Sequence, residues 1–438
     1  MFYEKEKLKT ASVIILTLTA MALLTVKFYI IPKNVEKTVS QPYNIDYGAA
    51  LEDVVYPSSV IIYGSENTYK FMRREYNIYE NFKDSLLKAN FDDKLNVDTS
   101  ITQDVLKKSG AFAAIFNPAV ESRLLAASLG IKDNVFSEKE PILSVFISSK
   151  YPNRCYFFSD ENTYFIKLKT DIDFKSLTLN FEKNPRKFYS LHDLFNAAAD
   201  TLITNETEEN FPIYATDDIL NDKEKDDIAR RIFIGKYDFL NRIESADNSY
   251  LYSYNYGEET LKILEHGDFK YSNENLPSRT DLGILENFYA ALNFLTRIGY
   301  DFSGMRLVNT EETELHGKKI FNFTFVLLFG NMDIYSENNF YDVCVSVSGS
   351  EILSCSGCRR NVSNILKTER KAKNYLEILD RFYTYMEEKS KISADEFFKN
   401  IGSIDTVYYM KEDGILTPCL KMEYTGKPYF CSIYGDIK

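Results

Sequence analysis

The sequence predicts an α+β protein: a single N-terminal transmembrane helix followed by a multi-domain extracytoplasmic body of antiparallel sheets with covering helices. Three observations predict this class. One long apolar run lies near the N-terminus, period-two and helical patterns alternate along the rest of the chain, and aromatic residues make up 15% of the 438 residues. That much aromatic material is ample for several cores, and the length indicates two to four domains.

The apolar run covers residues 11–31 and contains one charged residue, Lys27. A helix of this length reaches roughly 30 Å, which is the thickness of the hydrocarbon core of a bilayer. Residues 1–10 carry three lysines and two glutamates, so we expect a cytoplasmic tail and a body outside the cell membrane. A cleaved signal peptide is the alternative, but the run is longer than cleavage requires, which favours a single-pass anchor.

Small and hydroxylated residues follow one side of this predicted helix at helical spacing: Ser12, Thr19, Ala22 and Thr25. Such a stripe allows a second helix to approach closely and predicts a helix–helix interface. The alternative is a stripe without a partner, since small residues are common in membrane-spanning helices.

Residues 32–58 are punctuated by proline and glycine and predict a stalk above the membrane. Residues 59–204 predict an N-terminal α+β domain. Its strands are expected at 60–63, 111–116, 142–148, 155–159 and 163–168, and its helices at 68–89, 119–129 (opened by Pro118) and 188–200.

Residues 205–275 predict a charged middle linker followed by a β-meander. Two C-terminal α+β repeats, 276–362 and 363–438, then share one order of elements, a helix followed by strands. The expected elements are a helix at 281–298 with Ser278 and Asp281 in a capping box, strands at 320–329 and 343–347, a helix at 369–389, and strands at 405–411, 415–424 and 428–434.

The sequence offers little chemistry. The net charge is −12, and residues 1–37 contribute six lysines and three glutamates, so the remainder carries −15. An acidic body disfavours binding to nucleic acid. The three histidines have no neighbours at metal-ligand spacing, and no nucleotide-binding or hydrolase motif occurs, so we expect no enzyme, metal or cofactor.

Cys355 and Cys358 have the CxxC spacing of a redox pair or of half a zinc site. A second CxxC is missing, and the nearest histidine in sequence, His316, is far away. Structural thiols are therefore the preferred interpretation, and the redox state of the two cysteines stays open.

Four segments together resemble the YycH family: 114–118 (AlaIlePheAsnPro), the meander at 254–271, 298–302 (IleGlyTyrAspPhe) and 416–430 with its Pro-containing strand. The order of elements resembles that family over nearly the whole chain, and the C-terminal part is also similar to YycI and PepSY-like modules. The chain departs from the family at Cys419, where a tryptophan is expected.

The resemblance implies a membrane-anchored accessory protein of low-GC Gram-positive bacteria, which is not an enzyme. Such a protein modulates a sensor histidine kinase of a two-component system that controls cell-wall metabolism, and it acts with a YycI-like sister protein. A surface-anchored PepSY-like inhibitor or escort of a cell-wall hydrolase is the alternative, and an extracytoplasmic enzyme with an unrecognised site is the third hypothesis. The sign of regulation, the signal and a possible homo-oligomer stay open.

Overall fold

The computed structural model describes residues 46–434, except 65, 73–74, 133–134, 137–139, 175–176, 178–185, 198–200, 207–210, 218–219, 266, 277–281, 337–341, 360, 367–370 and 412–413. The predicted cytoplasmic tail, the predicted transmembrane helix and the stalk up to residue 45 lie outside these residues. None of the helices in the described part is long and apolar enough to cross a membrane.

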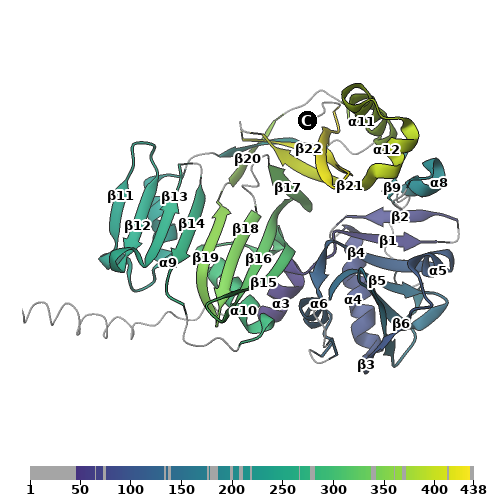
Figure 1. The fold of residues 1–438 in the computed structure, drawn as a ribbon, viewed down its shortest axis with the longest axis horizontal. Coiled ribbons are helices and arrows are strands. Elements are labelled where there is room, and N and C mark those ends of the chain that lie inside the picture. Colours follow the sequence, from purple (N-terminus) through teal and green to yellow (C-terminus); the bar gives the residue numbers. More distant parts are fainter. Residues whose placement is uncertain are drawn as a thin grey trace, which may run out of the picture.

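The described chain is an α+β protein built on two large sheets (Figure 1). The first sheet has nine strands in the order β3-β7-β6-β5-β4-β1-β2-β8-β9, and its strands pair antiparallel throughout the described residues. Its strands are β1 (Ser59–Tyr63), β2 (Thr68–Phe71), β3 (Phe91–Val97), β4 (Ala111–Glu121), β5 (Pro141–Ser148), β6 (Tyr151–Phe158), β7 (Thr163–Leu168), β8 (Lys187–Ser190) and β9 (Leu202–Ile203).

Short helices accompany the first sheet. They are α4 (Ile78–Ala89), α5 (Gln103–Lys108), α6 (Ser122–Ser128) and α8 (Leu191–Phe195), with a 3-10 turn at η2 (Glu75–Asn77). Phe82 of α4 stacks on Phe112 of β4 with ring centroids 4.2 Å apart, so this helix covers the sheet through its apolar stripe.

The second sheet has fourteen strands, and its first half carries the predicted meander. The strands of this half are β11 (Asn241–Glu244), β12 (Tyr250–Tyr254), β13 (Glu259–Ile263), β14 (Asp268–Asn273), β15 (Met305–Leu315), β16 (Lys318–Phe329), β18 (Asp342–Ser348) and β19 (Glu351–Cys358). Helices α9 (Asp222–Ile232) and α10 (Ile284–Ile298) pack on one face of them, and 3-10 turns lie at η3 (Tyr237–Phe239), η4 (Asn255–Gly257) and η5 (Phe302–Gly304).

The second half of this sheet forms a separate layer with its own hydrophobic cluster. Its strands are β10 (Ile213–Asp217), β17 (Met332–Ser336), β20 (Asn361–Leu366), β21 (Ile401–Met410), β22 (Ile415–Tyr424) and β23 (Lys427–Ser432), covered by α11 (Tyr375–Ser390) and α12 (Ala394–Asn400). The two halves join where β16 pairs with β17, which in turn pairs in parallel with β21.

One hydrophobic core runs through the N-terminal sheet and the first half of the long sheet. Helix α3 (Tyr47–Val54) buries Leu51 and Val54 and contacts α6, β15 and α10, so it links the N-terminal domain to the long sheet. This differs from the predicted stalk at 32–58: residues 47–54 form a capped helix in the core, because the apolar residues Ala50, Leu51 and Val54 share one face.

Other boundaries also differ from the sequence prediction. Residues 68–71 form strand β2 and not the start of a helix, because their period-two pattern pairs with β1. Strand β4 continues past Pro118, and α6 begins at Ser122, where the carboxylate of Glu121 accepts hydrogen bonds from two backbone amides. In place of the predicted helix at 188–200, strand β8 runs to Ser190 and the short helix α8 ends at Phe195.

The helices of the predicted C-terminal repeats begin later than expected. Helix α10 starts after Gly283, and the predicted capping box, Ser278 and Asp281, lies outside the described residues. Helix α11 starts after Asn374, whose side chain accepts a hydrogen bond from a backbone amide. In both segments the order is a helix followed by strands.

Strand β10 lies within the segment that the sequence predicts as a linker, residues 205 onward. It inserts between β22 and β20, pairing Tyr214 with Leu416 and Ala215 with Asn364. A strand from the middle of the chain therefore completes the C-terminal layer.

Candidate functional site

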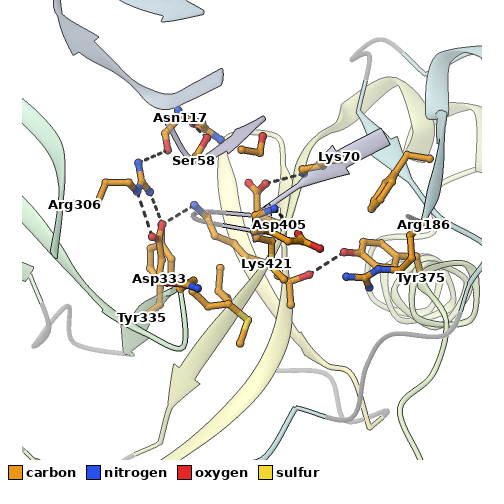
Figure 2. A pocket seen from close by; sticks show the side chains of 18 residues that line it. Ser58, Lys70, Asn117, Arg186, Arg306, Asp333, Tyr335, Tyr375, Asp405 and Lys421 are labelled. Carbon is orange, nitrogen blue, oxygen red and sulfur yellow. Dashed lines mark hydrogen bonds and ion pairs between the residues drawn. The ribbon is translucent and has the colours of Figure 1, made fainter. Parts of the chain in front are cut away.

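The candidate site is a charged crevice where the N-terminal sheet meets the long sheet, beside the junction of its two halves (Figure 2). Its polar lining residues are Ser58, Ser59, Lys70, Glu75, Asn117, Arg186, Arg306, Asn331, Asp333, Tyr335, Tyr375, Asp405, Thr406 and Lys421. The cavity measures about 50 Å³, which is room for a few water molecules. It is well below the size of an organic ligand, so the crevice is a joint and not a substrate pocket.

The first contact across the joint is made by Arg306, the second residue of β15. Its side chain is 3% exposed and forms a two-pronged pair with Asp333 of β17. The same guanidinium donates a hydrogen bond of 3.1 Å to the backbone carbonyl of Asn117, in β4 of the N-terminal sheet. Burial alone would lower the pKa of Arg306, but the carboxylate of Asp333 outweighs it and the pKa is raised.

The second contact joins β2 to β21. Lys70 Nζ lies 3.1 Å from Asp405 Oδ1 and donates to the Ile404 carbonyl, also at 3.1 Å. Burial alone would raise the pKa of Asp405, but the ammonium groups of Lys70 and Lys421 outweigh it and hold the pKa below its ordinary value. Asp405 therefore stays ionised at neutral pH and keeps this contact.

Aromatic hydroxyls complete the crevice. Lys421 Nζ donates to Tyr335 Oη over 3.2 Å and lies 4.6 Å from the centre of the same ring. Tyr375 Oη and Thr406 Oγ1 are 2.8 Å apart. These contacts link β17, α11, β21 and β22, so the crevice gathers elements from widely separated parts of the chain (Figure 2).

The arrangement is better suited to holding strands in fixed positions than to carrying out a chemical reaction. Its carboxylates face cations, and the described residues contain no group of three potential metal ligands. Buried ion pairs contribute little net stability, but they require one relative position of their partners. The crevice therefore holds two parts of the body in one relative position.

The predicted interface residues Ser12, Thr19, Ala22 and Thr25 all lie outside the described residues, and their prediction stays open. Sequence reasoning did not find the crevice. The one available signal was a charged residue next to apolar residues in a strand, as at Arg306 between Met305 and Leu307 and at Asp405 after Ile404, and that signal does not name a partner.

Cys355 and Cys358 are buried thiols of β19 and are not joined in a disulfide. Residues three apart on a strand point to opposite faces, and the two thiols accordingly belong to different hydrophobic clusters. Burial raises the pKa of Cys355 well above its ordinary value. The arrangement supports the preferred interpretation as structural thiols.

The comparison with known proteins rests on the fold. No family model and no curated protein matches the sequence. The structure of YycH from Bacillus subtilis is similar, with a TM-score of 0.60 and 14% identity, and the match covers 86% of this chain and 96% of that one.

Two further solved structures are similar at a lower level. An uncharacterized protein from Eubacterium rectale has a TM-score of 0.35 and 10% identity, covering 55% of this chain and 88% of that one. The C-terminal domain of YpeB from Bacillus megaterium has a TM-score of 0.29 and 12% identity, covering 51% of this chain and 98% of that one. Scores this low carry no argument. The match to YycH confirms the resemblance to the YycH family that the sequence patterns indicate, and the chain has a YycH-like fold.

Proposed function

We propose that this chain is a membrane-anchored, extracytoplasmic regulator of a sensor histidine kinase in a two-component system that controls cell-wall metabolism. The observation that carries the proposal is the YycH-like fold over 86% of the chain. In the proposed arrangement residues 11–31 span the membrane, residues 1–10 are cytoplasmic, and the chain acts through protein–protein contacts. Its partners are the kinase and a YycI-like sister protein.

The proposed mechanism is a coupling of equilibria. An accessory protein shifts a kinase between two conformations only by its different affinity for them. The crevice joins the N-terminal sheet to both halves of the long sheet, through Arg306 of β15 and through Asp405 of β21. A partner that binds one side of this joint therefore changes the geometry presented by the other side.

The test is crosslinking of the full chain in native membranes, with a photoreactive group at Ala22. The matched control carries the group at Leu24, which lies about 200° further round a helix. We expect an adduct with a sensor histidine kinase or with a sister accessory protein from Ala22 and not from Leu24. We also expect Ala22→Leu to change phosphorylation of the response regulator.

Deletion of the gene separates the remaining outcomes. Unchanged response-regulator phosphorylation in the deletion strain contradicts the proposal. If the deletion instead alters the abundance or processing of a cell-wall hydrolase, the escort hypothesis replaces it. If a body without residues 1–31 restores the deletion strain fully, the helix serves as a tether and the contact with the kinase lies in the body.

A further inference from the structure

The long sheet has one face that helices leave uncovered. Helices α9 and α10 lie behind the first half of this sheet, where they bury residues such as Phe323 and Val345 (Figure 1). Alternate residues point the other way, and in the middle of these strands, as at Asn322, Thr324 and Ser346, they are partly exposed. We call this side the open face.

Strand register places two rows of residues across the open face. One row is Lys262, Lys270, Ser356, Cys344, Thr324 and Asn309. The next row is Thr260, Ser272, Ser354, Ser346, Asn322 and Glu311. The middle of the face thus carries short side chains, whereas a sheet face made for water alone usually carries long charged ones.

The short polar groups bond to one another within the sheet. Thr260 and Ser272 hydroxyls are 2.7 Å apart, and Ser354 donates to Ser346 over 2.9 Å. Because these hydroxyls have partners on their own face, covering them leaves few orphaned donors. Short side chains also lose little conformational entropy on burial. Removing water from the middle of the face therefore costs little free energy for a polar surface.

Charge at the two flanks indicates which surface fits. Lys262 and Lys270 lie on β13 and β14, and Glu311 lies on β15 at the other end of the sheet. A two-fold axis parallel to the strands and passing near β18 and β19 exchanges these ends. The lysines of one copy then face the β15 flank of the other, with Glu311 one row away, about 7 Å along the strand and within reach of a lysine side chain.

We propose that the open face is the contact surface of a homodimer, in which two copies of this chain pack sheet against sheet. Under this axis the overlap spans the six strands from β13 to β15, or about 25 Å at roughly 4.8 Å a strand, and about 20 Å along them. This gives about 500 Å² per copy, below a standard stable interface of about 800 Å² per partner. The dimer is accordingly weak and favoured at the high local concentration of a membrane surface.

Cys344 provides a native probe. All six cysteines lie in the described part of the chain, and Cys344 is partly exposed while the other five are buried. It lies on β18, next to the proposed axis. Facing sheets are separated by about 10 Å, which is too far for a disulfide, so a short bismaleimide is the appropriate crosslinker.

The experiment uses the full chain, in detergent and in membrane vesicles. We expect a product of twice the monomer mass that disappears in Cys344→Ser. Lys262→Glu and Glu311→Lys should each lower its yield about fivefold, because two symmetry-related attractions become repulsions. The double reversal in one chain should restore it. Lys167→Glu, an exposed lysine on β7, is the matched control and should leave the yield unchanged.

Labelling with a monofunctional maleimide first establishes that Cys344 is reactive. With that shown, three results overturn the proposal: no product of twice the mass at any concentration, a product whose yield is the same in all charge variants, or a Cys344 adduct with a different protein in place of the homodimer.

Discussion

Replacement of Arg306 by methionine tests whether the crevice is a joint. The change removes a cation that is 3% exposed and leaves the carboxylate of Asp333 and the carbonyl of Asn117 without it. Breaking a buried pair by removing one partner costs about 3–5 kcal/mol. We expect the whole body to unfold as one unit, because one hydrophobic core joins the N-terminal sheet to the first half of the long sheet and the ion pairs of the crevice join both to the C-terminal layer.

The expected shift in melting temperature follows from the size of that unit. An unfolding entropy of about 2.1 cal/mol/K per residue gives about 0.8 kcal/mol/K for a body of roughly 390 residues. Arg306→Met should therefore lower Tm by about 4–6 °C. The chain has no tryptophan, so differential scanning calorimetry or far-ultraviolet circular dichroism is the suitable assay.

The matched control is Lys132→Met. Lys132 pairs with Asp93 at 2.7 Å, but the two side chains are 67% and 68% exposed. An exposed pair is worth about 0–1 kcal/mol, so this variant should shift Tm by about 1 °C or less. Adding Asp333→Leu to Arg306→Met should recover part of the loss, because it removes the uncompensated carboxylate. The reasoning is refuted if Arg306→Met shifts Tm no more than Lys132→Met does.

Three further predictions concern single features of the body. The pKa of Asp405 is held below its ordinary value of 3.8, so the ion pairing of its carboxylate stabilises the folded state above pH 3.8, and this stabilisation is lost as the pH falls through the lower pKa of the folded state. The Tm difference between wild type and Asp405→Asn should therefore be constant above about pH 5 and vanish in stronger acid. A Tm difference that grows in acid contradicts this. Native protein should react with a maleimide at Cys344 and not at Cys355, while denatured protein reacts at all six cysteines; mass spectrometry of labelled peptides decides this. Asn221→Ala removes the capping box of α9 and should lower the stability of that helix by about 1 kcal/mol, which hydrogen exchange would detect as faster amide exchange in α9. Unchanged exchange in α9 would show that packing alone sets its stability.

The strands were the most predictable part of the fold. Phe321, Phe323 and Phe325 alternate with polar residues, and this pattern is the local requirement of a sheet with one buried face. Helix starts were less predictable. In residues 68–71 the aromatic residues Tyr69 and Phe71 are two positions apart, as on one face of a strand, but four residues are too few to exclude a helix, and pairing with β1 decides between them.

The crevice and strand β10 were not predictable from local patterns. Arg306 and Asn117 are 189 residues apart, and Lys70 and Asp405 are 335 residues apart. No period in the sequence encodes such distances, because each residue satisfies only the ordinary rules of its own strand. The same holds for β10, whose composition fits a loop as well as a strand and whose place is set by partners near the C-terminus.

Insertion of β10 has a consequence for how the chain is made. Ala215 pairs with Ile415, so the two residues are synthesised 200 positions apart. At about 5–20 residues a second, β10 emerges roughly 10–40 s before β22 exists. During that interval its backbone lacks these hydrogen-bond partners, and any nascent chain that stops before residue 415 keeps an unfinished strand edge. Vectorial synthesis can therefore complete the N-terminal sheet early, but the C-terminal layer closes only when the last strands arrive.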